Sequence, residues 1–79
     1  MNNLQAYQHV FMEAFGVEPE VLNDTFTFQT IQEWDSMAHM SLISQLEETF
    51  DVFFETEDIL NYGSYLNGME ILRRYGIEF

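Results

Sequence analysis

Apolar residues near the start of the chain recur every three or four positions. They are Leu4, Tyr7, Val10, Phe11, Ala14 and Phe15. This spacing predicts an amphipathic helix over residues 3–15 that turns one face toward a core. Gly16 stands where a left-handed residue commonly ends a helix, and Pro19 prevents the helix from resuming.

The stretch from residue 17 to residue 34 has a different pattern. Polar and apolar residues alternate over residues 25–31, as in a half-buried strand, but no second such run offers a partner. We therefore predict a long loop that packs onto the helices through its own side chains. The apolar side chains available for this packing are Val21, Leu22, Phe26, Phe28, Ile31 and Trp34.

A second helical pattern occupies the middle of the chain. Leu42, Ile43, Leu46 and Phe50 form its apolar stripe, which predicts a helix from Asp35 to Phe50 with Asp35 or Ser36 as its cap. Another face of the same helix is apolar near its start and acidic further along. This face carries Met37, Met40, Ser41, Ser44, Glu47 and Glu48.

Two further helices are predicted in the last third of the chain. Residues 56–60 form a short one with Thr56 as its cap, and Ser64 caps a longer one that ends before Gly76. The inward face of the longer helix is predicted to hold Tyr65, Leu66, Met69 and Leu72. The sum, over residues 1–79, is one all-α domain, a small bundle of three longer helices and one short helix.

Charge is the most unusual property of the composition. The 79 residues include 14 acidic side chains against two arginines, for a net charge of −12, and no cysteine. Nucleic acid and anionic membranes would repel such a chain, whereas a basic protein surface would attract it. No apolar run is long enough to span a membrane, and the acidic residues lack the spacing of a calcium loop. We expect a cytoplasmic monomer without a metal site.

Ser36 and His39 are the residues that suggest catalysis. A catalytic triad needs a base oriented toward the serine by a third group, and this pair lies on one predicted helix without a nucleophile turn. We therefore expect no enzymatic activity, and the simplest role of Ser36 taken alone is to cap the helix.

The order Trp34-Asp35-Ser36-Met37, followed by an amphipathic helix that ends near Val52, resembles the acyl carrier protein family. The resemblance implies that Ser36 carries a 4′-phosphopantetheine arm, added by a phosphopantetheinyl transferase that Asp35 assists. It also implies a packed first loop and acyl cargo in fatty acid, polyketide or specialised acyl-transfer pathways. Methionine at position 37 also occurs in D-alanyl carriers, so aminoacyl carriage of the D-alanyl or peptidyl kind is an alternative. An unmodified acidic interaction module is another.

The surface of the central helix suggests how such a carrier would meet its partners. Acids near a helix C-terminus cost roughly 0.3–1 kcal/mol each, so Glu47 and Glu48 are unfavourable for the helix itself. We predict that these acids, with Met37, Met40, Ser41 and Ser44, dock basic acyl-loading and acyl-transferring enzymes. The cargo would lie between this helix and residues 56–61. The apolar residues that could line that space, or simply fill the core, are Phe50, Phe53, Phe54, Ile59 and Leu60.

Overall fold

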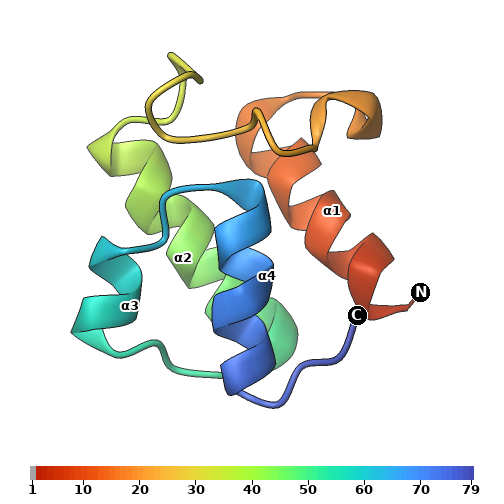
Figure 1. Cartoon of the computed structure of the whole chain (residues 1–79), viewed down its shortest axis with the longest axis vertical. Helices are drawn as coiled ribbons and strands as arrows, with labels where there is room; N and C mark the ends of the chain where they lie inside the picture. Colours follow the sequence, from red (N-terminus) through yellow and green to blue (C-terminus); the bar gives the residue numbers. More distant parts are fainter. Residues whose placement is uncertain (1) are drawn as a thin grey trace.

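The computed structural model describes residues 2–79, which form four α-helices, one short 3₁₀ helix and no strand. The elements are α1 (Asn3–Phe15), the 3₁₀ helix η1 (Pro19–Val21), α2 (Ser36–Phe50), α3 (Thr56–Leu60) and α4 (Tyr65–Arg74). The three longer helices, α1, α2 and α4, contribute buried residues to one core, and the short α3 lies at the edge of the bundle (Figure 1). The predicted all-α bundle of three longer helices and one short helix is confirmed.

The helix ends follow local capping chemistry. Asn2 caps α1 by accepting a hydrogen bond from the Gln5 amide at 2.8 Å, and Gly16 ends this helix with φ at 64°. Ser64 caps α4 through the Asn67 amide, as predicted. The prediction of Thr56 as the cap of α3 is wrong. Glu55 holds the extended cap position, so Thr56 lies inside the first turn and its backbone is already helical.

The core is built mainly from aromatic side chains. Tyr62 donates its hydroxyl to Tyr7 at 2.8 Å, and Tyr7 donates to the Tyr65 carbonyl at 2.6 Å. Burial raises the pKa of both Tyr7 and Tyr62, which therefore stay neutral. The fully or nearly buried apolar residues are Tyr7, Val10, Phe11, Leu22, Phe26, Trp34, Leu42, Ile43, Leu46, Phe54, Tyr62, Tyr65, Ile71 and Leu72.

Helix α4 approaches the core more closely than its sequence indicates. Leu66, predicted to face inward, is 45% exposed because it lies to one side of the stripe that starts at Tyr65. Gly68 takes the inward position, and a Cβ atom placed there would lie 2.2 Å from the ring of Tyr62. The missing side chain of Gly68 is therefore what admits the Tyr62 ring beneath α4.

The long first loop packs only in part as predicted. Leu22, Phe26 and Trp34 are buried in the core, whereas Val21 and Phe28 are 45% and 43% exposed. Backbone hydrogen bonds fix the loop to the start of α4: the Phe28 amide donates to the Gly63 carbonyl, and the Tyr65 amide donates to the Phe26 carbonyl, each at 2.9 Å. The alternating pattern thus yields a single bridge to residue 64 instead of a strand.

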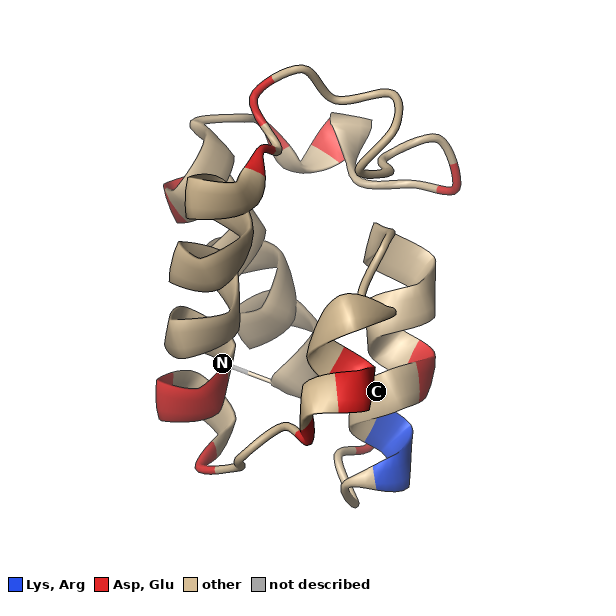
Figure 2. Cartoon of the chain, turned by 90° about the vertical axis from the view of Figure 1, so that its left-hand side faces the viewer, with Lys and Arg blue, Asp and Glu red and all other residues tan. Residues whose placement is uncertain are grey.

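The two cations of the chain lie together at the end of α4, whereas acidic residues are spread over the fold (Figure 2). Arg74 donates to Asp58 at 2.8 Å and Tyr75 donates to the same carboxylate at 2.6 Å. The hydrogen bond from Tyr75 contributes most to lowering the pKa of Asp58, and the bond from Arg74 comes next. Together they hold this pKa below its ordinary value. Asp58 therefore anchors α3 to the C-terminal end of α4. No helix in residues 2–79 is long and apolar enough to cross a membrane.

Candidate functional site

Ser36 is the first residue of α2, and its side chain is exposed. Of the two caps that the sequence allowed, the structure uses Asp35, whose Oδ1 accepts a hydrogen bond from the Ala38 amide at 2.9 Å. The hydroxyl of Ser36 is thus not needed to cap the helix. It lies in the first turn, where backbone N–H groups and the positive end of the helix dipole favour a negatively charged substituent.

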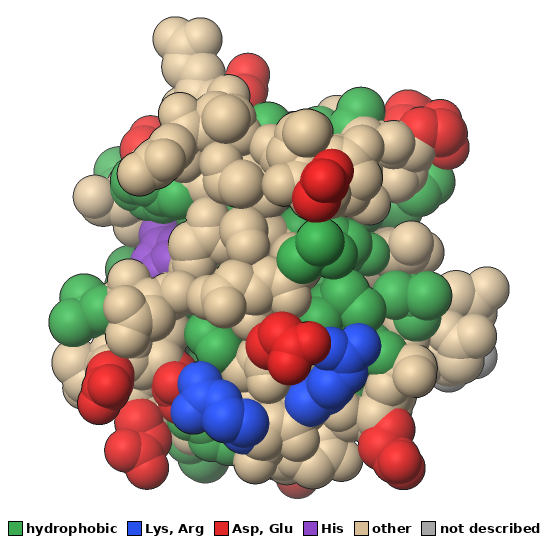
Figure 3. All heavy atoms as spheres, viewed as in Figure 1, with side chains coloured by type: hydrophobic (Ala, Val, Ile, Leu, Met, Phe, Trp, Pro, Cys, Tyr) green, Lys and Arg blue, Asp and Glu red, His purple; other side chains and the backbone are tan. Residues whose placement is uncertain are grey.

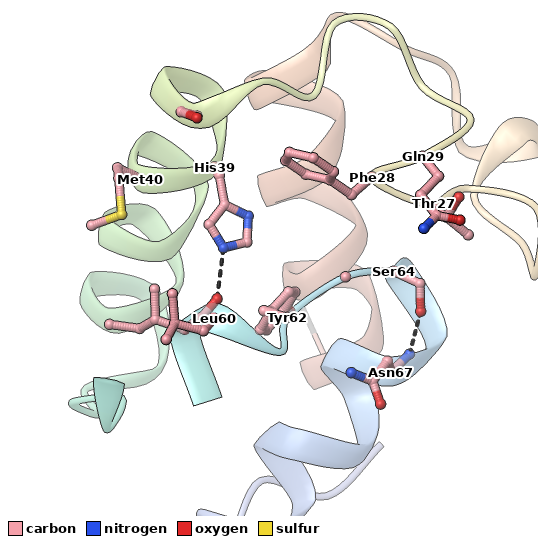
Figure 4. A pocket seen from close by; sticks show the side chains of 12 residues that line it. Thr27, Phe28, Gln29, His39, Met40, Leu60, Tyr62, Ser64 and Asn67 are labelled. Carbon is pink, nitrogen blue, oxygen red and sulfur yellow. Dashed lines mark hydrogen bonds between the residues drawn. The ribbon is translucent and has the colours of Figure 1, made fainter. Parts of the chain in front are cut away.

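A groove of about 700 Å³ opens beside Ser36. Its walls come from the first loop, the start of α2, the end of α3 and the turn that leads into α4. Figure 4 shows Met40 and Leu60 on one side, with His39, Phe28 and Tyr62 pointing into the middle. The other side is polar. The twelve residues that line the groove are Thr27, Phe28, Gln29, Ser36, His39, Met40, Ile59, Leu60, Tyr62, Gly63, Ser64 and Asn67.

The lining of this groove differs in charge from the chain as a whole. The chain has 14 acidic residues, yet none of the twelve lining residues is Asp, Glu, Lys or Arg. Apolar walls with a few hydroxyl and amide groups are typical of small-molecule pockets, and volumes of roughly 300–1,000 Å³ are usual. The groove can therefore hold an uncharged chain, with hydrogen-bonding groups available on one side only.

His39 forms part of the floor of this groove and is hydrogen-bonded at both ring nitrogens. The indole Nε1–H of Trp34 donates to its Nδ1 at 3.0 Å, so Nδ1 must be the acceptor. Nε2 then carries the hydrogen and donates to the Ile59 carbonyl at 2.7 Å. Neither nitrogen serves Ser36. Instead, His39 connects the first loop, α2 and the end of α3.

The apolar periodicity does not predict this role of His39, although the sequence contains a signal for it. A buried tryptophan needs an acceptor for its indole N–H, and His39 follows Trp34 by five residues, about one turn into the predicted helix. Periodicity alone could not show that the same ring also reaches the carbonyl of Ile59, twenty residues further along the chain.

The predicted docking residues lie on α2, and one of them, Glu47, also makes a hydrogen bond within the fold. Met37 and Met40 are 83% and 52% exposed, and Ser41, Ser44 and Glu48 are exposed as well. Glu47 is only half-exposed because its Oε2 accepts a hydrogen bond from the Phe54 amide at 2.9 Å. That carboxylate therefore also fixes the connection between α2 and α3.

Of the five residues that could line the cargo space or fill the core, three do not border the groove. Ile59 and Leu60 line the groove, but Phe54 is buried in the core, where its ring packs on Tyr62. Phe50 packs against the C-terminal Phe79, and Phe53 is 84% exposed in the connection to α3. The left-handed Asp51 ends α2 directly after Phe50, so Phe53 and Phe54 lie beyond the helix and do not follow its spacing.

The surface seen in Figure 3 carries apolar side chains at several places, and the two arginines lie at its lower edge among acidic groups. Within residues 2–79, no three histidine, aspartate or glutamate side chains are grouped closely enough to hold a metal ion. Comparison with protein-family models, with curated proteins and with solved structures finds no match for this chain.

Proposed function

We propose that this chain is a carrier protein that holds a 4′-phosphopantetheine arm on Ser36 and presents acyl thioesters to other enzymes. The observation that carries the proposal is the position of Ser36. Ser36 is exposed at the start of α2, and its hydroxyl is not used as the helix cap because Asp35 caps the helix. Ser36 also borders a groove that could receive a flexible arm. This placement agrees with the residues that resemble the acyl carrier protein family.

The residues around Ser36 fit such a group. A phosphodiester on its oxygen would meet the first backbone N–H groups of α2, which have no acceptor within the helix. When attached, the arm supplies the reactive thiol, which this cysteine-free chain lacks. Asp35 has two oxygens, of which Oδ1 caps the helix, so Oδ2 can face the transferase that adds the arm.

We assign partner docking to the exposed face of α2. Its methionines provide a soft apolar patch next to Ser36, and Glu48 adds negative charge further along. The exposed Leu60 at the end of α3 extends the apolar surface. A partner enzyme with apolar contacts and arginine or lysine around them would complement this face, and the net charge of −12 would speed their encounter.

Intact mass spectrometry tests the carrier proposal directly. The purified chain is incubated with coenzyme A, Mg²⁺ and a phosphopantetheinyl transferase, and we expect a mass gain of one phosphopantetheine group. Ser36→Ala should abolish the gain. Thr49→Ala is the matched control, because Thr49 is also an exposed hydroxyl residue of α2 but lies outside the predicted docking residues, and this variant should be modified like the parent chain. Absence of any mass gain would leave only the unmodified acidic module.

Charge reversal tests the docking face separately. Glu48→Lys should reduce the rate at which the transferase modifies the chain, and the reduction should fade at high salt. Glu20→Lys, an exposed acid in η1 away from α2, is the control for net charge. Equal rates for the two variants would mean that only overall charge matters and that this face is not a docking surface. Glu47 is unsuitable for this test, because its carboxylate accepts a hydrogen bond from the Phe54 amide and its replacement would also disturb the fold.

A further inference from the structure

The groove beside Ser36 has a closed floor, and this limits what an arm on Ser36 could carry. Two residues form the floor. His39 is bonded at both nitrogens, between the Trp34 indole and the Ile59 carbonyl, and Tyr62 is buried with its hydroxyl bonded to Tyr7. A chain that entered the core here would have to displace one of these rings and leave buried polar groups without partners.

Both rings are held by close packing on the sides that face away from the groove. Tyr62 is held by Gly68 on one side, where even a Cβ atom would lie 2.2 Å from the ring, and by Phe54 on another, with ring centroids 5.8 Å apart. His39 is stacked on Trp34, which is 2% exposed, and Phe28 meets its ring edge-on. The route from the groove to the interior is thus filled by interlocked aromatic rings.

The walls of the groove add a restriction on charge. None of the lining side chains is an acid that could pair with the ammonium of an aminoacyl group. None is a cation that could pair with a second carboxylate, and both arginines are engaged at the far end of α4 by Glu70 and Asp58. A charged cargo in the groove would lose water without gaining a partner, which is unfavourable.

We propose that His39, bonded between Trp34 and Ile59, closes the floor of the groove and so confines the cargo on Ser36 to short, uncharged acyl groups that stay outside the core. This inference rests on the proposed carrier function and specifies its cargo. It disfavours aminoacyl cargo, and it also disfavours a long hydrocarbon chain sheltered inside the bundle.

The test loads the intact chain directly with acylated arms. A phosphopantetheinyl transferase that accepts acyl-coenzyme A transfers butyryl, β-alanyl or hexadecanoyl arms to Ser36, and mass spectrometry verifies each product. Backbone amide chemical shifts then report where the cargo lies, with the chain bearing the bare arm as reference. Phe28, Leu60 and Asn67 report on the groove, while Phe11 and Leu46 report on the core.

For the parent chain we expect the butyryl group to shift the amide signals of the groove. The β-alanyl group should leave the groove signals where they are in the chain that bears the bare arm. The hexadecanoyl group should leave the core signals unmoved. In His39→Ala, the hexadecanoyl group should shift the core signals and raise the midpoint of thermal unfolding. His39→Gln should restore part of the barrier, because its amide can still donate to the Ile59 carbonyl. His9→Ala, at an exposed histidine of α1, is the matched control and should behave as the parent chain.

Trp34→Phe provides a second route if His39→Ala does not fold, because it removes only the indole donor and keeps an aromatic ring in the core. It should admit the long chain more readily than the parent does. Three results would overturn the inference while leaving the carrier function intact. They are core shifts in the hexadecanoyl parent chain, no difference between the parent and the His39 and Trp34 variants, and groove shifts as large for β-alanyl as for butyryl. Failure of Ser36 to accept any arm would instead refute the proposed function, and this inference with it.

Discussion

Replacing Gly68 by alanine should destabilise this fold, although alanine is the better helix former. The Cβ atom would lie 2.2 Å from the ring of Tyr62, a buried side chain that cannot swing into solvent. Overpacking of this kind costs roughly 1–3 kcal/mol. Displacement of the Tyr62 hydroxyl from Tyr7 would add about 0.5–1.5 kcal/mol, and the helix propensity of alanine would return roughly 1 kcal/mol.

The expected net loss is therefore roughly 0.5–3.5 kcal/mol. A chain of 79 residues has a total stability of about 4–12 kcal/mol, so this loss is a large fraction. Urea denaturation followed by circular dichroism measures it, and the thermal midpoint should fall by about 4–8 °C for each kcal/mol. Gly63→Ala is the matched control, since its nearest neighbour would be the Asn61 carbonyl oxygen at an ordinary 3.9 Å.

A double-mutant cycle isolates the contact with the ring. In a Tyr62→Leu background the ring is gone, so Gly68→Ala should become neutral or stabilise the chain by up to roughly 1 kcal/mol. The sign of the Gly68 effect should thus depend on residue 62. The reasoning would be refuted if Gly68→Ala stabilised the parent chain, or if its effect were the same in both backgrounds.

Substitutions at three further residues test other parts of the structure. Asp35→Ala removes the helix cap and should lose about 0.5–2 kcal/mol of stability in urea denaturation. Asp35→Asn should keep the cap but be modified more slowly by the transferase. Equal modification rates for Asp35→Asn and the parent chain would show that the carboxylate charge has no role. Asp51→Gly should stabilise the chain by roughly 0.5–1 kcal/mol, because Asp51 ends α2 in the left-handed region with φ at 54°, and a destabilised variant would contradict this. The folded-state pKa of Asp58 is depressed, so its bonds to Tyr75 and Arg74 stabilise the fold above the unfolded pKa of about 3.9 and lose that effect as pH falls through the folded value. Asp58→Asn should therefore unfold at a lower urea concentration than the parent chain at pH 7. This difference should shrink below about pH 4, and a larger difference there would contradict the reasoning.

The helices of this fold could be predicted from local sequence because local chemistry determines where they begin and end. Gly16 and Ser64 act within one turn of the residues they cap, and the apolar spacing of α1 and α2 is regular. Thr56 misled the prediction, since a threonine caps a helix only if its backbone is extended. In this chain the extended residue before α3 is Glu55.

The groove could not be predicted in the same way, because its parts come from four separate segments. Phe28 was expected to be buried, yet its position is fixed by a backbone bond to Gly63, thirty-five residues away. Phe53 and Phe54 are adjacent and equally apolar, but one is 84% exposed and the other 7%. Hydrophobicity alone does not predict which of these two neighbours is buried, because their burial depends on the path of the chain between α2 and α3.

The residues from Trp34 to His39 have several different structural roles within a short segment of the chain. Trp34 inserts the end of the first loop into the core, Asp35 starts α2, and Ser36 is thereby directed outward. His39 joins the same tryptophan to the end of α3. Because each residue positions the next, the exposure of Ser36 and the closed floor of the groove are two results of one arrangement. A substitution at Trp34 should therefore change the site more than its distance from the Ser36 hydroxyl would suggest.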